Sequence, residues 1–392
     1  MSEEDRWASR KVQAAVQNVK IKEYFIQIKF LLLVTALRMK SKRHTSLEST
    51  IVQNFNKYKP FLLGLMFFWA SGSYAQDPVF SQFFLSPLHN NPAFCGLDEA
   101  PRFSLQYRNQ WPAIEGNFNT YTTTAFSYDQ FFGKWKSGIG AHLLADNSGD
   151  GILRSYKATA VYGYQAPLYK KGYYIKGGLE FGLAHYSLDW DRFIFGDQID
   201  PEYGPVSPGG TPYPSAELEP SQKGRTYIDV GAGILYYTPV FYLGVSSKHI
   251  NTPDNSLLDQ SLNPNDGLPV RWTILTGGDI RLSRAGRTLQ VFSPTLLYAL
   301  QSSFWQLNIG GIYQISSLQL GLFYRQSRQN SDALITMLGL KKGIYRFSYS
   351  FDYTLSDLGI SQGGSHEIGI GINLAPIRQR SKVRTDCFDA FR

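Results

Sequence analysis

Residues 345–353 read Tyr-Arg-Phe-Ser-Tyr-Ser-Phe-Asp-Tyr, with an aromatic side chain at every odd position and a polar one at every even position. A period of two indicates an extended strand, because successive side chains of a strand point to opposite faces. A soluble sheet would bury the aromatic face in a core, whereas a membrane barrel would turn it toward lipid. The pattern of the whole chain distinguishes these alternatives.

Similar strands follow one another over most of the chain. An even number of strands, many of ten residues or more, is typical of barrels whose tilted strands cross a membrane. We therefore expect an all-β fold: a closed antiparallel transmembrane β-barrel of about fourteen strands, with about twelve to sixteen compatible with the pattern. The expected strands are 103–109, 119–130, 137–146, 153–165, 173–188, 225–237, 240–248, 270–283, 287–300, 304–315, 318–328, 332–341, 344–355 and 365–374.

The lengths of the connections support a barrel. Every connection after an even-numbered strand is short, whereas the long ones all follow odd-numbered strands: 110–118, 189–224, 249–269 and 356–364. Outer-membrane barrels keep short turns on the periplasmic side and long loops outside. We therefore expect an outer-membrane, multi-pass protein with both termini in the periplasm. The aromatic rows then face lipid, and Arg346, Ser348, Ser350 and Asp352 face the lumen.

A leader precedes the strands. Lys57-Tyr58-Lys59 is followed by the apolar run 61–70 and by Ser71-Gly-Ser-Tyr-Ala75, which are the parts of a secretory signal peptide. The run is too short for a membrane-spanning helix. We expect a signal peptide over 57–75 with cleavage after Ala75, and we expect residues 1–56 to be an extension that is absent from the mature protein.

The remaining chain divides into three parts. Residues 76–102 form an N-terminal segment, residues 103–374 the barrel, and residues 375–392 a periplasmic tail. Asn90-Asn91-Pro92-Ala93 indicates a turn within the first part. Two interpretations remain open for residues 76–102: a periplasmic tether to the first strand, or a segment that folds into the lumen and narrows it.

The composition excludes several classes of protein. Residues 1–75 carry 12 of the 39 Lys and Arg residues and 5 of the 31 Asp and Glu residues, so the mature chain is nearly neutral and offers no basic surface for nucleic acid. The six histidines lack metal-ligand spacing, and no nucleophile elbow appears. A calcium loop at 146–151 would lack its twelfth-position Glu, where Lys157 stands. We expect no enzymatic activity, no cofactor and no metal; a lipid-face hydrolase built on His185 has no convergent partner residues.

Cys95 and Cys387 lie near opposite ends of the mature chain. Two unrelated thiols are one interpretation, and a disulfide that ties the terminal segments together in an oxidising compartment is the other.

Several motifs resemble those of a known family. The stretches are Gln76-Asp77-Pro78-Val-Phe80-Ser81-Gln82, Asn91-Pro92-Ala93-Phe-Cys-Gly96, Tyr107-Arg108-Asn-Gln110-Trp111, Ala125–Asp129, Phe195-Gly196-Asp197-Gln198, Phe241–His249 and Ser365-His366-Glu367-Ile368. In this combination the chain resembles the PorP/SprF family of outer-membrane proteins of the type IX secretion system. The motifs span nearly the whole mature chain, although the ending Cys387-Phe-Asp-Ala-Phe-Arg and the long extension depart from the family pattern.

The resemblance implies a function that composition does not. It implies an outer-membrane protein of Bacteroidota-type bacteria that supports the export, the surface anchoring, or both, of proteins with a C-terminal sorting domain. Gliding adhesins are among the implied cargo. The implied partners are membrane lipid, the cargo, and the periplasmic and outer-membrane secretion machinery. The alternative is an outer-membrane channel for small hydrophobic or polar solutes.

Three sites have interpretations of their own. We expect Arg108 to point inward and to pair with a lumen carboxylate such as Glu367 or Asp352, because an unpaired charge there is costly. We expect a network of Asp, Arg and Gln side chains to brace the base of loop 189–224. Trp190 and Phe195 in that loop are candidate partner contacts, because aromatic side chains dominate binding hot spots.

Overall fold

The computed structural model describes residues 77–113, 121–169, 172–217, 219–220, 222–257, 267–282, 290–328, 331–355, 360–374 and 387–391. The expected extension 1–56 and signal peptide 57–75 lie outside the described residues. The strands are β1 (Arg102–Gln110), β2 (Tyr121–Phe132), β3 (Ser137–Ser148), β4 (Leu153–Pro167), β5 (Tyr174–Leu188), β6 (Gly224–Tyr237), β7 (Phe241–Lys248), β8 (Arg271–Gly278), β9 (Ile280–Arg281), β10 (Gln290–Gln301), β11 (Phe304–Ile315), β12 (Leu318–Ser327), β13 (Ser331–Lys342), β14 (Tyr345–Thr354) and β15 (Ser365–Asn373).

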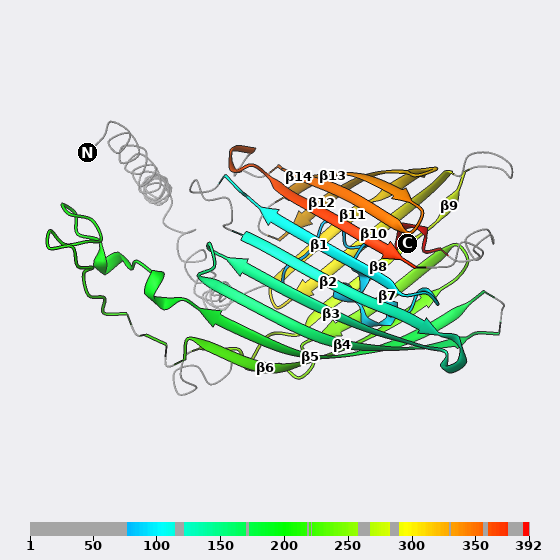
Figure 1. Ribbon diagram of the computed structural model, residues 1–392, viewed down its shortest axis with the longest axis horizontal. Helices are drawn as coiled ribbons and strands as arrows, with labels where there is room; N and C mark the ends of the chain where they lie inside the picture. Colours follow the sequence, from blue (N-terminus) through cyan, green and yellow to red (C-terminus); the bar gives the residue numbers. More distant parts are fainter. Residues whose placement is uncertain are drawn as a thin grey trace, which may run out of the picture. The chain divides into compact units, whose positions relative to one another are not determined.

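The strands close into the barrel that the sequence predicts. Each pairs antiparallel with its neighbour in the chain, and β15 pairs with β1 from Arg102↔Asn373 to Gln110↔Ser365. β8 and β9 together form one barrel strand, interrupted at Asp279, so the barrel has fourteen strands. Figure 1 shows these strands running side by side around the barrel. Closure satisfies the backbone groups that a lipid environment would otherwise leave unpaired.

The opening stretch has the orientation that its alternation predicts. Tyr345 and Phe347 are 47% and 50% exposed, whereas Arg346 and Ser350 are 4% and 0% exposed. The aromatic row therefore lies on the outer surface of β14, and the polar row faces the lumen. Among the described helices, none is long and apolar enough to cross a membrane.

The short and long connections lie at opposite ends of the barrel, as predicted. The connections 133–136, 238–240, 316–317 and 343–344 lie at one end of the barrel, here called the short-turn end, and 189–223 and 249–270 lie at the other. The latter end carries the long green loop in Figure 1. The sorting is imperfect, because 302–303 and 328–330 are short connections at the long-loop end.

Residues 77–100, here called the lumen segment, lie inside the barrel. The segment contains the short helices α3 (Pro87–Asn90) and η2 (Pro92–Phe94), and it is buried from Phe80 to Gly96. Its hydrogen bonds go to inward-facing side chains of strands far away in the chain. Asp77 contacts Arg271 and Gln301 at the long-loop end of β8 and β10, so the segment enters there, although the sequence predicts both termini at the short-turn end.

An apolar core fills part of the lumen. Phe83, Phe84 and Leu85 of the lumen segment pack with Ile312 and Phe323, which point inward from β11 and β12. Ile312 is an exception to the polar and apolar alternation of β11, and it is only 2% exposed. The exception thus has a physical cause, because an apolar side chain on the lumen face has an apolar partner inside the barrel.

The lumen segment packs closely against a glycine of the wall. A Cβ atom added to Gly178 of β5 would lie 2.2 Å from Ala93 N and 2.3 Å from Pro92 C. A Cβ added to the neighbouring Gly177 would meet nothing within 4 Å. Gly178 therefore permits a backbone contact between the wall and the lumen segment that no other residue allows.

This pair of glycines gives a matched test. Gly178→Ala should displace the lumen segment at a cost of about 1–3 kcal/mol, a typical overpacking penalty, and should raise the maleimide labelling rate of buried Cys95 in folded protein. Gly177→Ala should leave the rate unchanged. Equal labelling rates in the two variants would contradict the close packing of the segment against β5.

Candidate functional site

Four side chains form a central charge cluster inside the barrel: Arg108 of β1, Arg325 of β12, Asp352 of β14 and Glu367 of β15. Arg108 Nη2 lies 2.9 Å from Asp352 Oδ2, and Arg108 Nη1 lies 3.3 Å from Glu367 Oε2. Arg325 Nη1 lies 2.8 Å from the same Asp352 oxygen. The predicted pairing of Arg108 with these carboxylates is confirmed, and two cations balance two anions at a site that is almost fully buried.

The lumen segment binds directly to the central charge cluster. The backbone N–H groups of Ser81 and Gln82 donate to the two carboxylate oxygens of Glu367, at 2.8 and 2.9 Å. Ser81 Oγ also donates to Asp352 Oδ2 at 2.6 Å. Hydrogen bonds to an ionised acceptor are roughly twice as strong as neutral ones. The cluster therefore anchors the lumen segment as well as joining four strands.

A second charged site lies where the segment enters the lumen. His249 follows β7 directly and lies between two carboxylates. Its Nε2 atom is 2.8 Å from Asp77 Oδ2, and its Nδ1 atom is 2.9 Å from Asp229 Oδ1. Arg271 Nη1 lies 3.3 Å from the same Asp77 oxygen, and Lys157 pairs with Asp229. Burial opposes the charge on His249, but the two carboxylates outweigh it and raise the pKa of His249. Because ionised carboxylates only accept, the doubly protonated imidazole is the form that satisfies both contacts.

A third contact holds the segment at the short-turn end. Lys176 Nζ donates to the backbone oxygens of Cys95 and Gly96, each at 2.8 Å. Gly96 N donates to Asp129 Oδ2 at 2.7 Å, and the same carboxylate accepts from Arg102 Nε at 2.9 Å. Gly96 has a φ of +70°, a conformation that glycine adopts without strain. No disulfide forms here: Cys95 and Cys387 are both buried thiols, so the alternative of a terminal disulfide is wrong.

The structure brings many of the motif residues together. Those that meet at the three lumen contacts are Asp77, Ser81, Gln82, Gly96, Arg108, His249 and Glu367. Others shape the lumen segment: Pro78 O accepts from His89 Nε2, Phe80 is buried against the His89 ring, and Asn91 Oδ1 caps the helix that contains Pro92 and Ala93. The motifs are thus mostly residues that hold the lumen segment in the barrel.

The other motif residues lie elsewhere. Tyr107 points outward, and His366 Nδ1 lies 2.8 Å from the hydroxyl of outward-facing Tyr349. Gln110 ends β1, and Trp111 follows it with a φ of +55° and packs edge-on against Tyr121. Gly196, Asp197 and Gln198 belong to the long loop.

Sequence analysis missed several wall residues of the lumen contacts: Lys157, Lys176, Asp229, Arg271 and Arg325. All lie within strands on the inward-facing side, and a charged residue at such a position is the signal that could have identified them. Which charge meets which could not be inferred, because the partners lie on strands far apart in the chain.

The long loop between β5 and β6 carries an aromatic cluster. The ring centroid of Trp190 lies 4.9 Å from that of Phe195 and 5.8 Å from that of Phe193. Ile194 beside them is 60% exposed and Phe193 36% exposed. The cluster, here called the loop aromatic cluster, therefore presents apolar surface at the long-loop end.

Polar contacts brace this loop as predicted. Arg192 Nη2 pairs with Asp150 Oδ2 at 2.9 Å, which joins the loop to the β3–β4 connection. Asp197 Oδ2 accepts from Ala216 N at 2.6 Å, and Gln198 Nε2 donates to Tyr213 O at 2.7 Å. Asp150 of the connection between β3 and β4 thus pairs with an arginine of the long loop.

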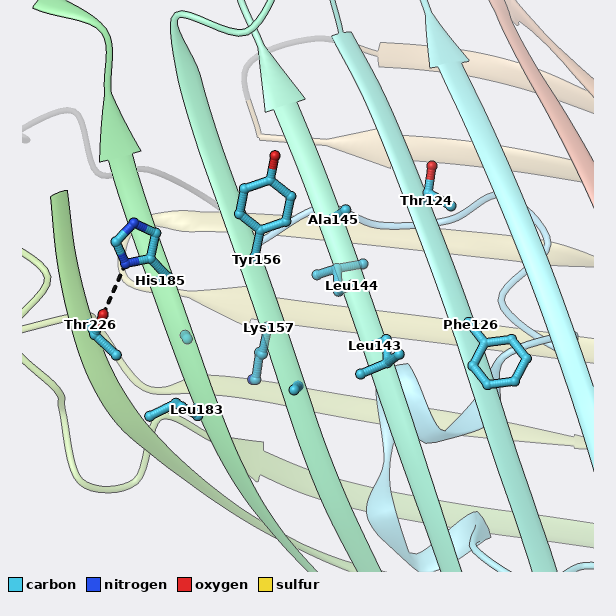
Figure 2. Close-up of a pocket in the computed structure, with 12 residues that line it drawn as sticks. Thr124, Phe126, Leu143, Leu144, Ala145, Tyr156, Lys157, Leu183, His185 and Thr226 are labelled. Atoms are coloured by element: carbon cyan, nitrogen blue, oxygen red, sulfur yellow. Dashed lines mark hydrogen bonds between the residues drawn. The ribbon is translucent and has the colours of Figure 1, made fainter.

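A depression of about 490 Å³ lies over β2–β6, and Figure 2 shows its lining. The small side chains Ala145 and Ala158 lie among Phe126, Leu143 and Tyr156. His185 Nδ1 lies 2.9 Å from Thr226 Oγ1, but the lining contains no serine and no carboxylate that would complete a hydrolytic site. The depression is mostly apolar.

The central charge cluster makes a testable prediction. Arg108→Gln leaves Glu367 buried without its cation and should lower the free energy of unfolding by about 3–5 kcal/mol, the cost of breaking a buried pair. Arg192→Gln removes one partner of an exposed pair and should cost about 0–1 kcal/mol. Urea titration in lipid vesicles measures both. A loss for Arg108→Gln no larger than for Arg192→Gln would refute the anchoring role.

Comparison with solved structures finds other β-barrels at low similarity. A triple mutant of the porin of Rhodopseudomonas blastica is 8% identical with a TM-score of 0.30, over 70% of this chain and 99% of that one. A mutant of the monoaromatic hydrocarbon channel TodX is 12% identical with a TM-score of 0.39, over 74% and 92%. No curated protein matches the chain.

Comparison with protein families gives a match over most of the chain. The family described as "Type IX secretion system membrane protein PorP/SprF" matches residues 72–372, a range that contains the lumen segment and its three contacts with the wall. The barrel, the lumen segment and the motif residues that join them fall within this one match, and the chain therefore belongs to the PorP/SprF family of type IX secretion system membrane proteins.

Proposed function

We propose that this protein supports the export, the surface anchoring, or both, of proteins with a C-terminal sorting domain, and that it acts as a filled barrel whose outer loops contact the cargo. The observation that carries the proposal is the occupied lumen. Phe83, Phe84 and Phe94 are each 0–1% exposed inside the barrel, so the segment stands where a passing solute would have to move. A barrel through which solutes diffuse would need that space to be filled with water.

The wall contacts make the lumen segment costly to remove. Three separate sites hold it, and each includes a buried charged side chain of the wall: Glu367, Arg271 and Lys176. Withdrawing the segment would remove hydrogen-bond partners from these charges in the interior, which is costly. The alternative, a channel for small hydrophobic or polar solutes, therefore requires a large rearrangement before any solute can pass.

The working surfaces then lie at the two ends of the barrel. In an outer membrane the long-loop end faces the outside, so the loop aromatic cluster is available to cargo, and gliding adhesins are one class of such cargo. The short turns face the periplasm and the secretion machinery there. Lipid contacts the outward rows of Tyr, Phe and Leu. The mechanism needs no catalytic residue, cofactor, metal or nucleic acid.

A deletion strain tests the proposal directly. Loss of the gene should remove one or a few sorting-domain proteins from the cell surface in quantitative surface proteomics. Uptake of small aromatic and polar solutes should be unchanged. A normal surface proteome together with impaired solute uptake would instead establish the channel.

The loop aromatic cluster gives a sharper test. Trp190→Ala with Phe195→Ala should reduce the surface amount of the affected cargo by about tenfold or more, since hot-spot truncations commonly cost at least about 2 kcal/mol. Tyr203→Ala alters an aromatic residue of the same loop that is 54% exposed and should have no effect. Immunoblotting must show equal amounts of barrel in each strain. Unchanged cargo in the double variant would exclude the cluster as the contact.

A further inference from the structure

The last described residues, 387–391, return to the barrel although β15 ends at Asn373. They read Cys-Phe-Asp-Ala-Phe and contain the short helix η8 (Asp389–Phe391). Phe388 and Phe391 are 1% and 2% exposed, and Phe391 N donates to Phe388 O at 3.0 Å. This turn places two phenyl rings three positions apart on one side. We call these five residues the C-terminal segment.

An aromatic receptacle made of Phe94, Tyr237 and Tyr242 holds the two rings. The Phe388 centroid lies 5.0 Å from Tyr237 and 5.5 Å from Tyr242. The Phe391 centroid lies 5.2 Å from Phe94 and 5.3 Å from Tyr242. Tyr237 ends β6 and Tyr242 lies at the start of β7, on either side of the turn 238–240. The receptacle therefore lies at the short-turn end, where Figure 1 marks the C-terminus.

The wall also binds the backbone of the C-terminal segment. Arg346 Nη2 donates to Ala390 O at 2.6 Å, and Arg102 Nη1 donates to Phe391 O at 3.3 Å. Asp389 N donates to Asp279 Oδ2 at 2.7 Å, at the interruption between β8 and β9. Three polar contacts to the backbone and the packing of two aromatic rings hold the segment, as in a peptide-binding site.

Arg346 keeps one hydrogen-bond donor for a further ligand, as far as the described residues show. Its side chain is buried, and among the described residues its Nη1 atom has no hydrogen-bond partner and no carboxylate pairs with it. A buried guanidinium without an anion is costly unless a ligand completes it. The site could therefore accept a peptide that brings a carboxylate in addition to two rings.

The barrel does not depend on the C-terminal segment for its sheet. Every barrel strand has both of its neighbours without it, and the segment contributes no strand pairing. Four of the twelve residues that precede it, 375–386, are Lys or Arg. Its departure would break the three polar contacts and the ring contacts of five residues but no strand pairing, so the sheet would stay closed.

We propose that the aromatic receptacle, with Arg102 and Arg346, is an exchangeable peptide-binding site. The chain's own C-terminal segment fills it in cis, and a partner segment with two aromatic side chains three positions apart fills it in trans. The short-turn end faces the periplasm in the proposed orientation, so the partner is a periplasmic protein with such a segment. The site itself does not depend on the cargo function proposed above.

Two buried thiols in the natural chain allow a test without mutation. Cys387 belongs to the C-terminal segment and Cys95 to the lumen segment, and both are 0% exposed. The full-length protein in detergent is treated with a maleimide, and mass spectrometry follows each cysteine. Cys387 should react at least about tenfold faster than Cys95, because local opening of a small segment needs less free energy than withdrawal of an anchored one.

A peptide of residues 387–392 carrying Cys387→Ser is the probe for the trans site. In excess it should occupy the receptacle, keep the cis segment out, and accelerate Cys387 labelling several-fold while leaving Cys95 unchanged. The same peptide carrying Phe388→Ala and Phe391→Ala should have no effect. Equal slow labelling of both cysteines would overturn detachment, and fast Cys387 labelling that the first peptide does not change would overturn the exchangeable site.

Discussion

The structure depends on how the inward-facing charges of a fourteen-stranded barrel are satisfied. About eight strands already enclose a space that side chains can fill, so fourteen leave room that water or protein must occupy. Here protein occupies it: the lumen segment brings backbone N–H groups to Glu367, and Asp77 to His249 and Arg271. The wall supplies charges in near balance, and the segment adds hydrogen bonds to several of them. Each part therefore stabilises the other in this form.

The outer surface of the barrel and its loop lengths were predictable because they follow from simple rules. Alternation over Tyr345–Tyr353 and its equivalents follows from a two-residue period and a lipid-facing surface, and the parity of the loops follows from a membrane with two different sides. These rules act residue by residue and need no knowledge of distant contacts. The interruption at Asp279 did not follow from them, because it depends on Ser293 and Asp389 from other parts of the chain.

The inside was predictable only in part. A buried Arg108 needs an anion, and the inward-facing side chains of β14 and β15 limited the candidates to Asp352 and Glu367. The pairing of His249 with Asp77 and Asp229 could not be inferred, because it requires the lumen segment to enter from the long-loop end. Ile312 did carry a signal of the filled lumen, since an apolar residue on a polar face needs an apolar partner within the barrel.

The interior contacts connect the two ends of the molecule. The lumen segment touches His249 near the long-loop end, and its Phe94 forms part of the aromatic receptacle at the short-turn end. Between these points it is held by Glu367 and by Lys176. A displacement of Phe94 by an incoming peptide would therefore strain a chain that is bonded along its length to the wall, and densely packed interiors transmit such strain. These contacts favour the proposed filled barrel over an open channel.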